Sequence, residues 1–217
     1  KIVVKDWTNK ATNIGYIQGA DDLVDDVLKS LNINVTNLSW NDFQNASYIQ
    51  KFDAIVVGIR AYNVNNEITS IQPLLMQYVK NGGTVVVQYN TDKNLKINDL
   101  GPYPIELSRK RITEENAKVN MLNPEHKLLQ TPNQITIADF DNWIQERGIY
   151  YPSSWDNRYE TLISSNDKNE TALESNILYV QYGKGHYIYT PLVFFRQLPD
   201  GNSGAIKLFL NLLSVGK

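Results

Sequence analysis

The chain has 217 residues, no cysteine, two histidines and a formal net charge of −2. Without cysteine there can be no disulfide, thiolate nucleophile or thiolate metal ligand, and the small negative charge argues against nucleic-acid binding. No apolar run approaches the roughly 18–20 residues that a membrane-spanning helix needs, so we expect no membrane span. Because the sequence starts at Lys1 rather than Met, we expect a fragment or a processed form of a longer protein.

Strand-like and helix-like patterns alternate in the first part of the chain. A short β-like run at 1–7 is followed by expected strands at 13–19 and 35–39, with an expected helix at 21–32 between them. A further short helix is expected at 41–49. Strands that alternate with helices are typical of a doubly wound parallel sheet.

The segment 51–91 contains the clearest βαβ unit. Strands rich in Val and Ile are expected at 54–58 and 84–87, and such runs suit strands that are buried on both faces. The apolar residues between them share one helical face, at Ile71, Leu74, Leu75, Tyr78 and Val79. Gly82 and Gly83 then favour the end of that helix. We therefore predict an α/β fold with a flavodoxin-like parallel sheet in the strand order 2-1-3-4.

The middle of the chain departs from this rhythm. Residues 93–160 contain prolines at 102, 104, 124 and 132 and only short strand-like pieces. We expect a single domain over 1–217, in which 93–160 form a partly β insertion that packs as a lid over the strand ends. Within it, the spacing predicts a short helix at 138–146 and an aromatic loop at 150–156.

Regular patterns return at the end of the chain. Strands are expected at 161–164, 177–182 and 186–192, and Gly183-Lys184-Gly185 predicts a tight hairpin between the last two. A loop with two phenylalanines follows at 194–197, and the closing helix is expected at 203–215.

Polar and aromatic side chains crowd the predicted carboxyl ends of the strands, where open α/β sheets bind ligands. Arginine can hold a carboxylate bidentately, and aromatic faces beside amides and carboxylates suit sugar rings. We predict ligand contacts from Arg60, Tyr62, Asn63, Tyr89, Asn90, Trp143, Glu146, Arg147, Arg196 and Gln197. The alternative is that these residues pin the insertion by hydrogen bonds within the chain, with Glu146 and Arg147 as a buried pair.

The other polar features of the sequence do not predict a cofactor or metal site. The turn at Gly19 lacks a glycine-rich phosphate fingerprint, and the helix after it begins with four acids that repel an anion, so we expect no nucleotide, FMN or NAD cofactor. The two histidines, His126 and His186, are far apart in sequence, so we expect no metal site. The basic run at 109–111 is expected to form a solvated face.

Five segments resemble a known module: FDAIVVGIRAYN, GGTVVVQYNT, LGPYPIELSRKRIT, DFDNWIQERGIYYPSSWD and YGKGHYIYTPLVFFRQLPDG. They resemble the C-terminal domain of bacterial proteins whose N-terminal part is a PIG-L/LmbE-type deacetylase. That domain belongs to the class I glutamine amidotransferase-like fold. More distantly, the second and fifth segments resemble the ThuA-like, sugar-associated branch of the same fold.

One departure from this fold class excludes its best-known reaction. Amidotransferases carry a cysteine in the elbow after a central strand, with histidine and glutamate partners, and the corresponding segment here, 88–91, offers Tyr89 and Asn90. Without the Cys-His-Glu triad, glutamine hydrolysis is ruled out.

The resemblance implies a non-catalytic or catalytically reduced accessory domain of a carbohydrate-active deacetylase. Its partners would be the N-terminal deacetylase domain of the same polypeptide and a glycan-like ligand, and its location would be extracytoplasmic, periplasmic or secreted. Two alternatives remain open: a ThuA-like sugar-modifying enzyme and a purely structural interaction domain.

Overall fold

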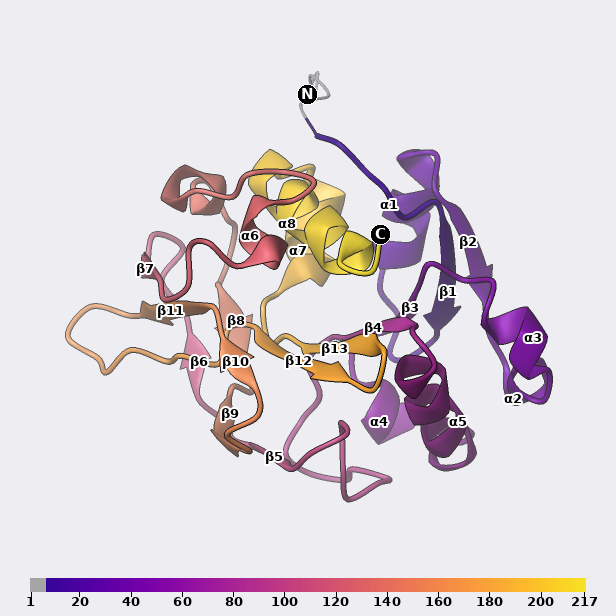
Figure 1. Cartoon of the computed structure of the whole chain (residues 1–217). Helices are drawn as coiled ribbons and strands as arrows, with labels where there is room; N and C mark the ends of the chain where they lie inside the picture. Colours follow the sequence, from indigo (N-terminus) through magenta and orange to yellow (C-terminus); the bar gives the residue numbers. More distant parts are fainter. Residues whose placement is uncertain (1–6) are drawn as a thin grey trace.

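A seven-stranded mixed sheet forms the centre of the molecule, in the order β10-β12-β13-β4-β3-β1-β2 (Figure 1). The computed structural model describes residues 7–217, so almost all of the β-like run expected at 1–7 lies outside the described residues. Five neighbouring strands are parallel: β2 (Asn34–Asn37), β1 (Asn13–Ile17), β3 (Ala54–Val57), β4 (Thr84–Val87) and β13 (Gly185–Tyr189). The predicted flavodoxin-like order of the first four strands is confirmed. β12 (Leu178–Tyr182) and β10 (Glu160–Thr161) extend the sheet as antiparallel strands.

Successive side chains of the parallel strands enter two separate cores. Val56 and Val86 face the core that also holds apolar residues of α1 (Val24–Ser30), α7 (Phe194–Asp200) and α8 (Ser203–Ser214). Their neighbours Ile55 and Val85 face the core that is covered by α2 (Trp40–Phe43), α3 (Ala46–Ile49), α4 (Ala61–Val64) and α5 (Ile68–Lys80). The sheet is thus the middle layer of an α/β/α arrangement, which explains the unbroken Val and Ile runs.

Local signals fix several element ends. Helix α5 ends where Gly82 takes a φ of +116°, and the hairpin between β12 and β13 turns at Gly183 with a φ of +62°. Helix α1 begins at Val24, later than expected. The Asp22 carboxylate accepts a hydrogen bond from Val24 N (2.9 Å) and so stabilises that start. Leu23, which lies before this start and within the range expected to be helical, is 56% exposed.

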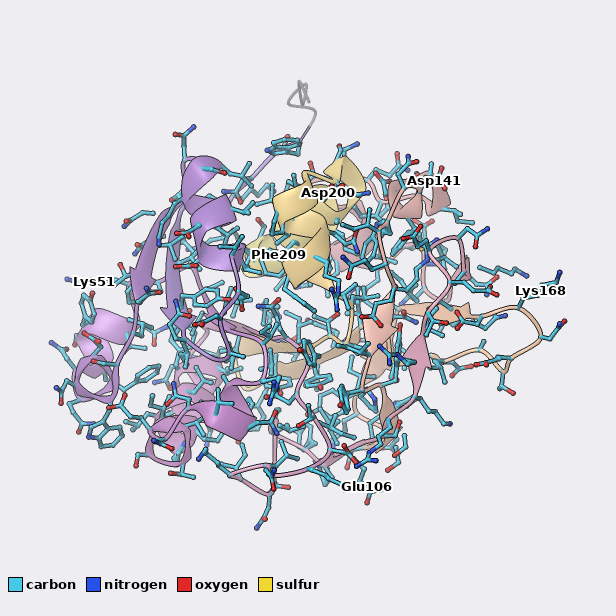
Figure 2. The ribbon with its side chains drawn as sticks, turned by 180° about the vertical axis from the view of Figure 1, so that it is seen from behind. Lys51, Glu106, Asp141, Lys168, Asp200 and Phe209 are labelled. Carbon is cyan, nitrogen blue, oxygen red and sulfur yellow. The ribbon has the colours of Figure 1, made fainter. Side chains whose placement is uncertain are left out.

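Small two-stranded sheets replace the helix–strand alternation after residue 93. β5 (Ile105–Leu107) pairs with β9 (Pro152–Trp155), and β6 (Arg111–Ile112) pairs with β8 (Gly148–Ile149). β7 (Lys118–Met121) pairs with β11 (Ile163–Asn166), and a short helix, α6 (Lys127–Gln130), follows β7. Figure 1 shows these small sheets beside the β10 end of the main sheet, and in Figure 2 Lys168 lies at the tip of the loop after β11, far from the buried Phe209.

Three expectations for this half of the chain are wrong. The helix expected at 138–146 is only a 3-10 turn, η1 (Ile137–Phe140), because Asn142 and Gln145 take left-handed φ values of +58° and +65° that a right-handed helix cannot continue. The aromatic loop at 150–156 contains strand β9. Residues 194–197, expected as a loop, begin α7 because Phe194 and Leu198 both pack into the core one turn apart.

Candidate functional site at the carboxyl ends of the strands

The ends of β3 and β4 are tied together by their backbones. Arg60 N donates a hydrogen bond to Tyr89 O (2.8 Å), just before helix α4 begins. Arg60 has a φ of +56°, in the left-handed region that residues with a side chain rarely occupy. The left-handed backbone at this edge therefore lies at Arg60, shortly after the end of β3, whereas Asn90 in the elbow has no positive φ. Strained residues of this kind concentrate at functional sites.

Aromatic rings from three separate segments meet at this edge. Tyr89 stacks on Tyr150 of the insertion, with ring centroids 6.1 Å apart and planes 8° from parallel. The ring of Phe195, from α7, lies 5.4 Å from the Tyr89 ring. Tyr150 and Phe195 are each only partly buried, and Tyr150 also has a left-handed φ of +55°. The edge therefore presents an aromatic surface, and the backbone around it takes uncommon left-handed conformations at Arg60 and Tyr150.

A line of charged groups borders this surface. The Glu146 carboxylate is 5% exposed and bridges Arg111 (Nη2–Oε2 2.6 Å) and Arg196 (Nη2–Oε1 3.1 Å). Arg196 also bonds to the Gln145 side chain and lies over the Phe195 ring. Burial raises the pKa of Tyr89, and the charges of Arg60 and Arg196 oppose that rise. We call Arg60, Tyr89, Glu146, Tyr150, Phe195 and Arg196 the strand-end site.

Arg60 is the one member of this group whose cation has no acidic partner among residues 7–217. No ion pair involves it, and its Nε is buried without a hydrogen-bond partner. With Arg60, Arg196 and the neighbouring Arg111 against Glu146, the site has an excess of positive charge. A cavity of about 280 Å³ adjoins it, lined by Arg109, Arg111, Ile149 and Tyr150. Arg111 lies on a solvated face, as expected, with its side chain 56% exposed, and from there it pairs with Glu146.

Three of the predicted ligand-binding residues bind other parts of the chain. Tyr62 N donates to Asn90 Oδ1 (2.9 Å), and the Tyr62 hydroxyl donates to Gln72 Oε1 (2.6 Å). The Asn63 amide bonds to both N and O of Thr91, at 3.0 and 3.2 Å. These bonds fasten α4 to the chain after β4, as the pinning alternative expects. Ligand contact by Tyr62, Asn63 and Asn90 stays a prediction.

Three further predicted residues lie in the interior. The Gln197 amide bonds to N and O of Ile144, each at 2.9 Å, and is fully buried. Trp143 is 1% exposed and its ring lies 5.4 Å from Phe140, so the expected aromatic wall from Trp143 is wrong. The alternative of a buried Glu146–Arg147 pair is not found either, because Arg147 donates to backbone carbonyls on the other side of the segment.

Sequence reasoning left Tyr150, Phe195 and Arg111 out of the predicted set. Phe195 is beside Arg196, which was chosen, and Tyr150 lies in the aromatic loop expected at 150–156. Their distinguishing feature is the backbone turn that aims them at Tyr89, and a left-handed φ at a tyrosine has no sequence signal. Arg111 had no such signal, because its closeness to Glu146 follows from the pairing of β6 with β8.

Both histidines lie at the opposite end of the sheet. His186 pairs with Thr84, the first residue of β4, and its Nδ1 is 2.9 Å from the Tyr179 hydroxyl. The His126 ring packs on the other side, 4.7 Å from the Tyr179 ring. Among residues 7–217, no group of three His, Asp or Glu side chains is placed to hold a metal ion. In the same part of the chain, every helix is too short or too polar to cross a membrane.

An Asn90→Cys variant should release no ammonia from glutamine above the rate of the unmodified protein. Asn90 is fully buried and both imidazoles are at the far edge, so the new thiol would have neither access nor a general base. A coupled ammonia assay measures this, with the unmodified protein as the baseline. Sustained glutamine turnover by the variant would contradict the geometry of the site.

No protein-family model and no curated protein sequence matches the chain. Solved structures do resemble it. A GMP synthase-like protein from Thermoplasma acidophilum superposes with a TM-score of 0.56, at 10% identity, over 96% of each chain. A ThuA-like protein from Bacteroides uniformis superposes with a TM-score of 0.53, at 14% identity, over 91% of this chain and 87% of that one.

The chain has a ThuA-like, glutamine amidotransferase-like fold. The same fold is found inside a longer enzyme: a β-galactosidase from Rahnella sp. R3 matches 93% of this chain with a TM-score of 0.54 and 15% identity. The match spans 31% of the β-galactosidase chain. At such identities the likeness establishes the amidotransferase-like fold alone, and function has to be argued from the site.

Proposed function

We propose that this chain is a carbohydrate-binding domain whose strand-end site takes an acidic sugar. The observation that carries the proposal is the unpaired Arg60 guanidinium beside the aromatic surface of Tyr89, Tyr150 and Phe195. A sugar acid offers a carboxylate to the arginine fork and a C–H face to the rings. The excess of positive charge at the site favours such a ligand over a neutral sugar.

We also propose that the domain serves a larger carbohydrate-active protein as an accessory module. The five sequence segments that resemble the C-terminal domain of PIG-L/LmbE-type proteins support a deacetylase domain on the same polypeptide as its partner. The occurrence of the same fold as about a third of a β-galactosidase chain supports the modular arrangement. On this proposal the protein acts outside the cytoplasm, where extracellular or wall glycans are accessible.

A ThuA-like sugar-modifying enzyme is the second candidate, favoured by the ThuA-like structural neighbour. The most buried acid of the site is Glu146, and both of its oxygens are held in ion pairs with arginines. Both oxygens are thus already engaged by guanidinium donors, which favours a binding role over a catalytic one. Incubating the isolated protein with trigalacturonic acid, and analysing the products by mass spectrometry, separates the two candidates: a binding module returns the sugar unchanged.

An Arg60→Ala variant should bind trigalacturonic acid about tenfold more weakly, the usual loss for one charge-assisted hydrogen-bonded contact. Isothermal titration calorimetry of the variant and the unmodified protein measures the change. Arg158→Ala is the matched control, because Arg158 is exposed and paired with Asp156 outside the strand-end site. Cellotriose, the neutral probe, should bind weakly to all three proteins. Equal affinity of the unmodified protein and Arg60→Ala for trigalacturonic acid would overturn the proposal.

A further inference from the structure

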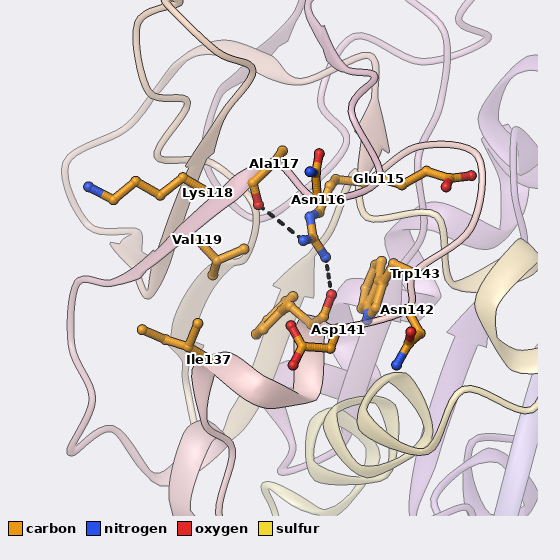
Figure 3. Close-up of a pocket in the computed structure, with 11 residues that line it drawn as sticks. Glu115, Asn116, Ala117, Lys118, Val119, Ile137, Asp141, Asn142 and Trp143 are labelled. Carbon is orange, nitrogen blue, oxygen red and sulfur yellow. Dashed lines mark hydrogen bonds between the residues drawn. The ribbon is translucent and has the colours of Figure 1, made fainter.

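A second, larger cavity lies on the other side of the segment that carries Glu146. Its volume is about 510 Å³, within the range of small-molecule sites. It opens between the start of β7 and the 3-10 turn η1 (Figure 3). Its lining combines one buried arginine, amides, acids and apolar side chains, from Glu115, Asn116, Ala117, Lys118, Val119, Ile137, Phe140, Asp141, Asn142, Trp143 and Arg147.

The arginine of this cavity, Arg147, is a buried cation that lacks an acidic partner. It is 4% exposed, and its Nη atoms donate to the carbonyl oxygens of Phe140 and Ala117, the two bonds drawn dashed in Figure 3. Its Nε has no hydrogen-bond partner, and among residues 7–217 no carboxylate forms an ion pair with it. A guanidinium has five N–H donors, so several remain unused. Burying a charge without a counterion is costly, so a bound anion would stabilise this site.

An acid lies close to this cation without contacting it. Burial lowers the pKa of Arg147, and the charge of Asp141 opposes that shift, so the two side chains affect each other electrostatically. No ion pair joins them. In Figure 3 the Asp141 carboxylate lies among the lining residues, whereas the charged ends of Lys118 and Glu115 extend away on opposite sides. The lining of the cavity therefore contains a buried cation and an exposed acid that do not form an ion pair with each other.

We propose that this cavity binds a small zwitterion of the α-amino-acid type with an apolar side chain. The ligand carboxylate would face Arg147 and its ammonium group would face Asp141, since an amino acid carries the complementary pair of charges on neighbouring atoms. Its side chain would lie against Ile137, which is 58% exposed, and Val119. The amides of Asn116 and Asn142 supply further donors and acceptors. This site is independent of the acidic-sugar site on the other side of the segment.

Arg147 also has a structural role, and the experiment has to separate the two. By bonding to Ala117 and Phe140 it clamps the two walls of the cavity together. Replacing Arg147 would therefore remove the clamp along with any ligand contact. Asp141 is the better target, because it is exposed and its hydrogen bonds are made by its backbone. Asp141 N donates to Ala138 O (3.1 Å), and Asp141 O accepts from Asn202 Nδ2 (3.0 Å).

Three matched probes test the proposal by titration calorimetry: L-phenylalanine, 3-phenylpropanoate, which lacks the ammonium group, and 2-phenylethylamine, which lacks the carboxylate. The unmodified protein should bind phenylalanine about tenfold or more tightly than either analogue, the effect of one lost charge-assisted bond. The Asp141→Asn variant should bind phenylalanine only as weakly as the unmodified protein binds 3-phenylpropanoate. Its affinity for 3-phenylpropanoate should be unchanged. Glu125→Gln, an exposed acid in the same insertion, is the control and should change neither.

Three outcomes would contradict the proposal that this cavity binds a zwitterion. Absence of saturable phenylalanine binding in the millimolar range would remove it altogether. Equal affinity for phenylalanine and 3-phenylpropanoate would show that the acid plays no part, and so would an Asp141→Asn variant that binds phenylalanine like the unmodified protein. An Ile137→Ala variant checks the place of binding, because its affinity for all three probes should fall together.

Discussion

Replacing Trp143 with alanine should lower the free energy of unfolding by about 3–5 kcal/mol, the usual cost of removing a large aromatic side chain from a core. Trp143 is 1% exposed and packs against Phe140 and Phe194, with ring centroids 5.4 and 5.8 Å away. Its indole N–H also donates to Asp139 O (3.1 Å), and that acceptor would lose its partner. Urea denaturation followed by circular dichroism measures the change.

The neighbouring Ile137 provides the control for this experiment. Ile137 is 58% exposed on the same 3-10 turn, so Ile137→Ala should change the free energy of unfolding by no more than about 0.5 kcal/mol. If Trp143→Ala were as stable as the unmodified protein, the indole would have to be a surface group. The ligand contact predicted for Trp143 from the sequence would then be supported.

Acidification from about pH 7 to about pH 4 should also destabilise the protein, with His186 alone contributing about 1–2 kcal/mol. His186 is 8% exposed, and burial, together with the charges of Lys127 and His126, lowers its pKa to about 4. In an unfolded chain a histidine titrates near pH 6.5. Between these values the unfolded chain binds a proton that the folded chain does not. The contribution of His186 to the free energy of unfolding is therefore fully present above about pH 6.5, and it is lost as the pH falls toward 4.

Thermal melts across this pH range, with His186→Gln as the comparison, isolate the contribution. Glutamine can still bond to the Tyr179 hydroxyl but does not titrate, so the melting temperature of the variant should fall less steeply between pH 6.5 and 4. Burial also lowers the pKa of His126, so this residue accounts for part of the pH dependence that remains in the variant. Parallel curves for the two proteins would show that His186 accepts a proton in the folded state as easily as in the unfolded one.

Much of the main sheet could be predicted because its signals are local. The Val and Ile runs of β3 and β4, the helical face of α5 and the glycine at its end each depend on a few neighbouring residues. The carboxyl edge follows from topology once the strands are parallel. At that edge Arg60 N bonds to Tyr89 O, and Arg196 lies over the Phe195 ring, which packs against Tyr89.

The insertion could not be predicted in the same way, because distant contacts decide its conformation. Asn142, Gln145 and Tyr150 take left-handed backbone conformations that end the expected helix and re-aim the side chains. Gln197 fixes Ile144 from more than fifty residues away. The sequence places Trp143, Glu146 and Arg147 near one another, but only the folded chain separates a core residue, a strand-end acid and a cavity arginine.

The alternation at Glu146 and Arg147 makes this short segment sensitive to chain length. Glu146 binds Arg111 and Arg196 on one side, while Arg147 binds the carbonyls of Ala117 and Phe140 on the other. Point substitutions can therefore alter one pocket and spare its neighbour. A one-residue deletion between Gln145 and Gly148 removes Glu146 or Arg147 itself and shortens the link to β8 that holds the other in place. Such a deletion would disable both pockets at once, so natural or engineered length variation has to avoid these positions.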